Sequence, residues 1–215
     1  KIMQLSGVNN GQQKILASAS YAQNGYYGFR FIPEYEGFYV LGDGKNHEYP
    51  LYLKAGDAVS LFMDKDTIYL TGKNNTAENK VLYDWVNLSK RVCEKSIFFT
   101  RSRSTYEDFF PEFEVLLSKI KPFCKNIETK NSRFNELMKH FISYELDRFA
   151  LNFIYTPRSK HPSKEQRIAY YNSIVDNNKF QDEVILEMPD GIKLLKLYMM
   201  FYCLENKKNA SDLQE

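Results

Sequence analysis

The pattern of hydrophobic and polar positions divides the chain into two parts of different character. Up to about residue 74, short runs rich in Tyr, Phe, Val and Ile alternate with clusters of Gly, Asn, Asp and Pro. This alternation is typical of β-strands joined by tight turns. Seven strands are expected, at residues 2–6, 14–21, 26–32, 37–41, 51–54, 58–63 and 68–70. Seven short strands at this close spacing favour an antiparallel β-sandwich or an open barrel.

After residue 74 the apolar positions recur at the three- and four-residue spacing of amphipathic helices. Asn75 and Thr76 offer a helix cap with Glu78 in the first turn, and the S-x-x-E sequence at 104–107 is a capping box. Pro111 is expected to bend that second helix or to mark its first turn. Five helices are predicted, beginning near residues 75, 104, 132, 163 and 192, with the fourth ending near 175 and the fifth near 204.

The placement of glycine supports the same division. Nine of the ten glycines lie at or before Gly72, and only Gly191 follows. Because glycine allows the positive-φ corners of tight turns and weakens helix interiors, this asymmetry indicates strands followed by helices. We therefore predict an α+β fold, with a β-rich unit over residues 1–74 and an all-helical unit of about five helices over residues 75–215.

Composition and charge exclude several classes of protein. The 215 residues are 43% hydrophobic and 15% aromatic, which excludes an intrinsically disordered chain. The 29 Lys and Arg nearly balance the 27 Asp and Glu, so charge gives no support for nucleic acid as a partner. The longest apolar stretch, residues 192–204, is shorter than the ~20 residues of a membrane span, and no transmembrane segment is expected. The chain opens KIMQLSGVNNG, without an initiator Met or an apolar secretory core, so we expect a removed leader or a fragment.

The three cysteines, Cys93, Cys124 and Cys203, are far apart and include no C-x-x-C motif. This number and spacing indicate neither a disulfide scaffold nor a zinc site nor a dithiol redox centre. We therefore predict no dithiol redox activity in this chain, and no disulfide between Cys93 and Cys124.

Other polar residues offer only weak candidates for chemistry. Glu34 and Glu36 lie in a turn, and nothing in the sequence places them at a shared pocket. The three histidines, at positions 47, 140 and 161, lack a second ligand at helical spacing. Basic residues gather around the last histidine, at Arg158, Lys160, Lys164 and Arg167. We interpret them as a solvated loop, with an anion or phosphate contact as the alternative. No catalytic, cofactor-binding or metal-binding residue is expected.

The apolar stretch at residues 192–204 is the most informative local feature, because as a helix it leaves almost no polar face. A helix that is apolar all round is normally buried, and core burial is the first interpretation. Alternatively, one side covers this chain and the other docks a further domain, since Met and aromatic side chains suit adaptable interfaces. The candidate docking residues are Tyr198, Met199 and Tyr202.

Several motifs along the chain resemble those of a known family. The strand and turn LYLKAGD at 51–57 precede a helix entry of the form G-x-N…E-N…L…W at 72–85. The helical part then carries Tyr, Pro-Arg, His-Pro, Tyr-Tyr, Phe and Pro-x-Gly elements at 155–162, 170–171, 180 and 189–191. Together these features resemble the N-terminal domain of bacterial cell-envelope thiol-disulfide oxidoreductases of the TlpA/ResA-like type.

The resemblance implies a periplasmic or cell-envelope protein whose catalytic part is a downstream thioredoxin-like domain with a W-C-x-x-C site. This chain has no such motif, so it is expected to be the accessory domain, which positions or selects protein thiol substrates. The alternative function is a free-standing interaction protein that binds peptide or carbohydrate on its aromatic-rich β part. Eight tyrosines fall within residues 1–75, and an exposed tyrosine cluster would favour this alternative.

Overall fold

The computed structural model describes residues 2–20, 22, 25–43, 48–64, 67–97, 103–174 and 181–206. Its fold is α+β, which confirms the predicted class. The chain forms two compact units, and these do not follow a single boundary at residue 74. Unit 1 comprises Lys1–Trp85, Thr129–Met138 and Glu183–Ile192, and unit 2 comprises Val86–Glu128, Lys139–Asp182 and Lys193–Glu215.

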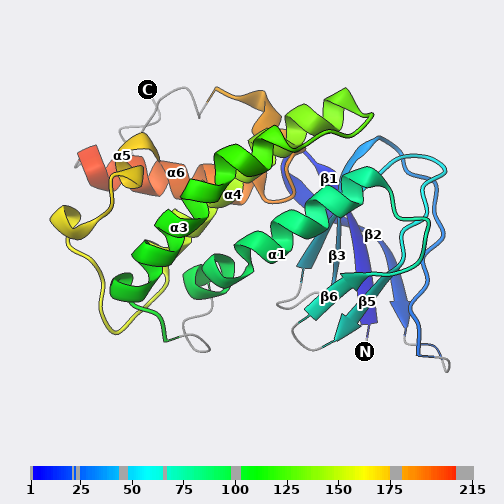
Figure 1. Ribbon diagram of the computed structural model, residues 1–215, viewed down its shortest axis with the longest axis horizontal. Helices are drawn as coiled ribbons and strands as arrows, with labels where there is room; N and C mark the ends of the chain where they lie inside the picture. The colour runs from blue at the N-terminus through cyan, green and yellow to red at the C-terminus, as the bar shows by residue number, and fades with distance from the viewer. Residues whose placement is uncertain are drawn as a thin grey trace. The chain divides into compact units, whose positions relative to one another are not determined.

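The β structure of the described residues belongs to unit 1 (Figure 1). Four antiparallel strands form one sheet in the order β2-β1-β3-β4. They are β1 (Ile2–Asn9), β2 (Gln12–Ser20), β3 (Gly37–Gly42) and β4 (Glu48–Leu53). A separate antiparallel hairpin consists of β5 (Leu61–Asp64) and β6 (Thr67–Leu70). The part expected as a sandwich or an open barrel thus takes the form of a four-stranded sheet and a hairpin.

The predicted strand at residues 26–32 is wrong, because this segment has no strand pairing. The sheet order gives the physical reason. β1 is already paired on both edges, with β2 and with β3, so the chain that leaves β2 must cross β1 to reach β3. The crossing segment is held by aromatic packing instead of a ladder. The ring centroid of Phe31 lies 5.6 Å from that of Tyr39, and Tyr35 stacks on Tyr39 at 4.8 Å.

Asn79 closes the outer edge of β4. The Tyr52 N–H donates to Asn79 Oδ1 at 3.0 Å, and Asn79 Nδ2 donates to the Tyr52 carbonyl at 2.7 Å. The Asn79 carboxamide therefore takes the place of a neighbouring strand. Pro50, two residues earlier, faces the same edge, where its missing N–H is tolerated. The side chain of Asn79 is buried in the first turn of α1 (Ala77–Ile97).

A second asparagine, Asn75, fastens the β5–β6 hairpin to the start of α1. Its Oδ1 accepts from the Ser60 N–H at 2.9 Å, and its Nδ2 donates to the carbonyls of Ser60 at 3.0 Å and Thr71 at 2.7 Å. The residue at the helix cap is Thr76, whose Oγ1 accepts from the Asn79 N–H at 3.3 Å.

The remaining helices are α3 (Tyr106–Lys125), α4 (Ser132–Tyr155), α5 (Tyr170–Ile174) and α6 (Gly191–Asn206). Of these, α4 begins where its cap predicts, and the capping box of α3 is Thr105 with Asp108, one residue after the predicted one. Thr105 precedes α3 and donates its N–H to Asp108 at 2.7 Å, so Pro111 lies inside the helix and not in its first turn. The Asn131 side chain caps α4 by accepting from the Phe134 N–H at 3.0 Å. No helix in the described ranges is long and apolar enough to cross a membrane.

The fourth predicted helix, at 163–175, is wrong as a continuous element. It forms a 3₁₀ turn at Lys164–Gln166 and, after a break, the short α5. The Ser163 N–H donates to Gln166 Oε1 at 2.9 Å and closes the turn locally. Arg167 then adopts an extended backbone, with φ −72° and ψ 143°, which ends the helical path. Residue 175 itself lies outside the described residues.

Two glycines allow a close backbone contact within unit 1. Asn10 and Gly11, with φ of 48° and 71°, form the β1–β2 turn that the sequence predicts. The Gly11 N–H donates to the Leu186 carbonyl at 2.6 Å, and the Ile192 N–H donates to the Gly11 carbonyl at 3.0 Å. Gly191 lies at this junction. Only glycine fits there, because a Cβ on residue 191 would stand 1.9 Å from the carbonyl oxygen of Ile185.

We predict that Gly191→Ala lowers the free energy of unfolding by roughly 1–3 kcal/mol or more, because the added methyl overlaps backbone that side-chain rotation cannot move. Gly28→Ala is the matched control, since nothing lies within 4 Å of a Cβ there. Its effect should stay within about 0.5 kcal/mol. Urea denaturation measures both. Equal stability of the two variants would contradict the close contact at Gly191.

Candidate functional site

A polar pocket of about 280 Å³ lies in unit 1 at the start of α4. Its lining comes from four segments: the bend before β3, the residue after β4, the first turn of α1 and the start of α4. Every lining side chain is charged or polar. The lining residues are Glu36, Lys54, Glu78, Lys130, Asn131, Ser132 and Arg133.

The basic side of the pocket contains Lys54, Lys130 and Arg133. Arg133 is paired with Glu187 at 2.6 Å. Lys54 and Lys130 are exposed, and their side chains form no ion pair within the described residues. The pocket also holds Ser132 and Arg133 at the first two positions of α4, whose N–H groups an α-helix cannot bond internally. Positive charge and free amides therefore gather on this side.

The acidic side contains two carboxylates with different surroundings. Glu36 accepts from the Tyr52 hydroxyl at 3.3 Å and from the side-chain amide of Asn131. Glu78 is only 8% exposed, and it has no hydrogen-bond or ion-pair partner in the part of the chain that the structure describes. A buried carboxylate normally accepts several hydrogen bonds or pairs with a cation. Glu78 therefore differs from the structural acids of this chain.

Tyr52 connects the pocket to the core of unit 1. Its ring packs edge-on against Phe134 at 4.8 Å and Phe38 at 5.6 Å, while its hydroxyl reaches Glu36. Burial, together with the nearby Glu36 carboxylate, raises the pKa of Tyr52 to about 12. The hydroxyl therefore stays protonated and donates to Glu36 at neutral pH.

Sequence reasoning missed this pocket. Nothing in the sequence suggested a shared pocket for Glu34 and Glu36, and the structure places Glu36, without Glu34, in the pocket with Glu78 and the start of α4. The two helix caps were predicted, but no local pattern says that the starts of α1 and α4 line one pocket. No signal in the sequence marks Glu78, because its burial is a property of the folded chain and its helix start is otherwise ordinary.

The docking residues expected on α6 do not share one environment. Tyr198 is 2% exposed and points inward with Leu194 and Phe201. Tyr202 is partly buried, and Met199 is 45% exposed. Two further side chains, Met200 and Leu204, are 49% and 65% exposed. The outward face of α6, defined here as Met199, Met200 and Leu204, thus contains only one of the three predicted residues.

Asp147 explains why Tyr198 points inward. This carboxylate is fully buried in unit 2 and accepts from the Tyr170 hydroxyl at 2.8 Å and from the Tyr198 hydroxyl. Burial, reinforced by Asp147, raises the pKa of both tyrosines far above the ordinary value. Both phenols therefore remain donors, and Asp147 holds α5 and α6 together as a structural group.

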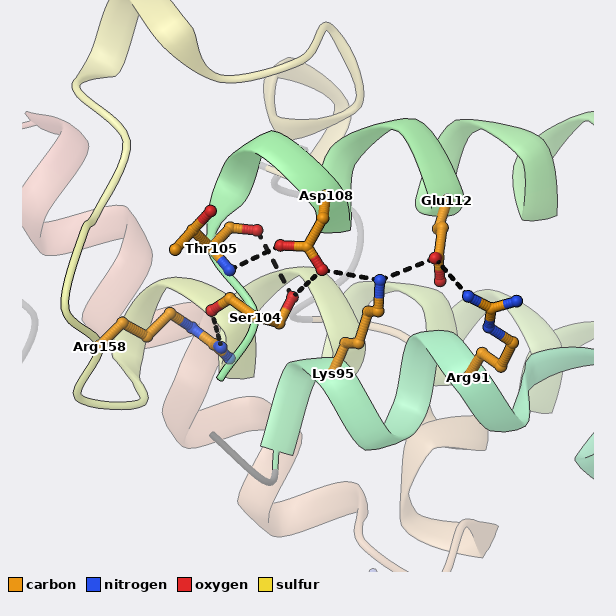
Figure 2. Close-up of polar contacts among 7 residues, drawn as sticks. All are labelled: Arg91, Lys95, Ser104, Thr105, Asp108, Glu112 and Arg158. Carbon is orange, nitrogen blue, oxygen red and sulfur yellow. Dashed lines mark hydrogen bonds and ion pairs between the residues drawn. The ribbon is translucent and has the colours of Figure 1, made fainter. Parts of the chain in front are cut away.

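Figure 2 shows a second polar cluster in unit 2, between α1 and α3. The Lys95 ammonium lies 2.7 Å from both Asp108 and Glu112, and Arg91 reaches Glu112 at 2.8 Å. Although burial opposes it, the bonds from Lys95 and Ser104 lower the pKa of Asp108. Each carboxylate here pairs with a cation, so the cluster fastens the two helices together.

The basic residues around His161 also form hydrogen bonds and ion pairs within the fold. Arg158 donates to the carbonyls of Phe153 at 2.7 Å, Ser104 at 3.0 Å and Ser96 at 2.6 Å (Figure 2 shows the Ser104 contact). Burial lowers the pKa of Arg158 to about 10, so it stays charged at neutral pH. The other three cations pair with carboxylates of unit 2: Lys160 with Glu107, and Lys164 and Arg167 with Glu205. These partners leave the anion-contact interpretation without support.

The cysteines and histidines show no assembled reactive centre in the described residues. Cys93, Cys124 and Cys203 are free thiols. Burial raises the pKa of Cys93 to about 11, and that of Cys124 also rises through burial. No group of three His, Cys, Asp or Glu residues that could hold a metal ion occurs among the residues with described positions. His47 lies outside the described residues.

Comparison with known proteins gives no match. The chain matches no protein-family model, no curated protein and no solved structure. The resemblance to TlpA/ResA-like oxidoreductases therefore rests on the sequence motifs alone.

We predict that Cys93 in the native chain reacts slowly with iodoacetamide at pH 8. Its raised pKa leaves roughly two hundredfold less thiolate than an ordinary thiol of pKa about 8.5. Peptide mapping after timed alkylation measures the rate at each cysteine, and the urea-unfolded chain is the control. Reaction of native Cys93 at the unfolded rate would contradict the prediction.

Proposed function

We propose that this chain is a non-catalytic accessory domain of a cell-envelope thiol-disulfide oxidoreductase. In this proposal, it positions or selects protein thiol substrates for a thioredoxin-like domain downstream in the same polypeptide. The observation that carries the proposal is the outward face of α6, where Met199, Met200 and Leu204 are exposed together on one helix. This grouping supports the proposal, because contiguous exposed apolar surface is typical of faces that another protein covers.

The chemistry of the thiols supports a non-catalytic role. An oxidoreductase needs a thiolate of lowered pKa, usually in a C-x-x-C motif at a helix N-terminus. Cys93 and Cys124 have raised pKa values and lie in different helices, α1 and α3. The catalytic thiols of the proposed protein would therefore belong to the downstream domain.

The motifs that carry the resemblance have structural roles that fit an accessory domain. The sequence at 51–57 contains the end of β4, including Tyr52, and the sequence at 72–85 contains Asn75 and Asn79. These residues fasten strands to α1 through their hydrogen bonds. A family pattern made of such residues reflects the requirements of the fold and not those of a catalytic reaction.

The alternative function, peptide or carbohydrate binding on an aromatic β surface, has less support. Tyr39, Tyr49 and Tyr52 are buried. Tyr26 and Tyr69 are the largely exposed tyrosines among the described residues of the β part. The tyrosines of the β part are therefore used mainly for packing.

The proposal predicts that the natural gene product is larger than this chain of 25.3 kDa and occurs in the cell envelope. An antiserum against the chain should detect, in the envelope fraction of cells that express the gene, a longer polypeptide. That polypeptide should contain a reactive thiol pair. A product of this chain's size alone, or one confined to the cytoplasmic fraction, would contradict the proposal.

We further predict that Met199→Asp in that full-length protein uncouples the two domains without unfolding this one. A charge on the outward face of α6 must be desolvated when the partner domain docks. Scanning calorimetry should show one coupled transition splitting into two. Val115→Asp, on an exposed position of α3, is the matched control and should leave the profile unchanged. Identical profiles for both variants would exclude docking on this face.

A further inference from the structure

We propose that the pocket at the start of α4 binds a small zwitterion of the α-amino acid class. The inference rests on unit 1 alone and does not depend on the proposed function. It joins two observations: a buried acid without a partner on one side of the pocket, and unpaired cations with free helix amides on the other.

The acidic side of the pocket is suited to bind a cationic group. Glu78 is 8% exposed, lines the pocket and has no donor from the described residues. Its place in the first turn of α1 gives the carboxylate some stabilisation from the helix dipole. The Glu78 oxygens are not among the buried side-chain atoms that lack a partner, so the carboxylate opens to the pocket, where a ligand can reach it. A ligand ammonium would donate charge-assisted hydrogen bonds to it.

The basic side of the pocket is suited to bind an anionic group. The N–H groups of Ser132 and Arg133 open α4, and Lys54 and Lys130 line the same pocket. Backbone amides at a helix N-terminus, with cations beside them, form a preorganised site for a carboxylate. Asn131 donates its side-chain amide to Glu36, which keeps that neighbouring acid occupied.

One ligand with both charges fits better than two separate ions. Neither Lys54 nor Lys130 pairs with Glu78, although all three line the same pocket. These opposite charges line one pocket without forming an ion pair with each other, and a zwitterion can contact both. A volume of about 280 Å³ lies just below the range of drug-sized ligands. An amino acid is a molecule of the corresponding size, and the polar lining matches its charged ends.

The test is a titration of the ¹⁵N-labelled chain by NMR at pH 7 and constant ionic strength. The probes are glycine, L-alanine, L-lysine and L-glutamate, with acetate and methylammonium as single-charge controls. At least one amino acid should give saturable shifts at the amides of Glu78, Ser132 and Arg133. Acetate and methylammonium should bind at least tenfold more weakly.

Variants separate the two halves of the pocket. Glu78→Gln keeps the shape but removes the charge, so it should weaken amino acid binding at least tenfold and leave acetate binding unchanged. Lys130→Ala should weaken both. Glu114→Gln, on an exposed position of α3, is the control and should change neither. Dispersed spectra show that each variant is folded.

Three results would overturn the proposal. Acetate that binds as tightly as every amino acid would show an anion site only. Saturable shifts with none of the amino acids would show no ligand of this class. Binding to Glu78→Gln as tight as to the unmodified chain would show that the buried acid plays no part. If Glu78→Gln is unfolded, Lys130→Ala and the single-charge controls still decide the outcome.

Discussion

Unit 1 depends on a pair of hydrogen bonds between one side chain and one residue of backbone. The Asn79 carboxamide accepts from the Tyr52 N–H and donates to the Tyr52 carbonyl, at 3.0 and 2.7 Å. Both groups lie at the outer edge of β4, where an unpaired strand would otherwise expose donors and acceptors. Because an amide side chain has the same donor and acceptor as a peptide group, it can end a sheet without another strand.

This contact also sets the geometry of the pocket. Glu78 precedes Asn79 in the chain, so fixing Asn79 fixes where the buried carboxylate lies. Lys54 follows Tyr52 by two residues, and the Tyr52 hydroxyl holds Glu36 on the other side. The ring of Tyr52 packs on Phe134 in the first turn of α4, whose start supplies the basic side. The acidic and basic halves are therefore positioned through the same residue pair.

The sequence was sufficient for most element types, because turns and helix starts have local signatures. The Asn-Gly turn at Gly11 and the caps of α1 and α4 lie where residue chemistry predicts. The segment at 26–32 has strand composition, but pairing depends on which strand edges are free, and that is a property of the whole sheet. The pocket was beyond sequence reasoning for the same reason. Its residues are separated along the chain by up to about a hundred positions, and no local pattern reports that Glu78 is buried without a partner.

The most direct test of the central claim is hydrogen exchange at the Tyr52 amide, compared between the unmodified chain and Asn79→Ala. If Asn79 replaces a strand partner, the Tyr52 amide should exchange as slowly as amides inside the sheet, and much faster in Asn79→Ala. Asn74→Ala, an exposed asparagine of the same segment, should leave this amide protected. Fast exchange in the unmodified chain, or equal protection in Asn79→Ala, would contradict the account.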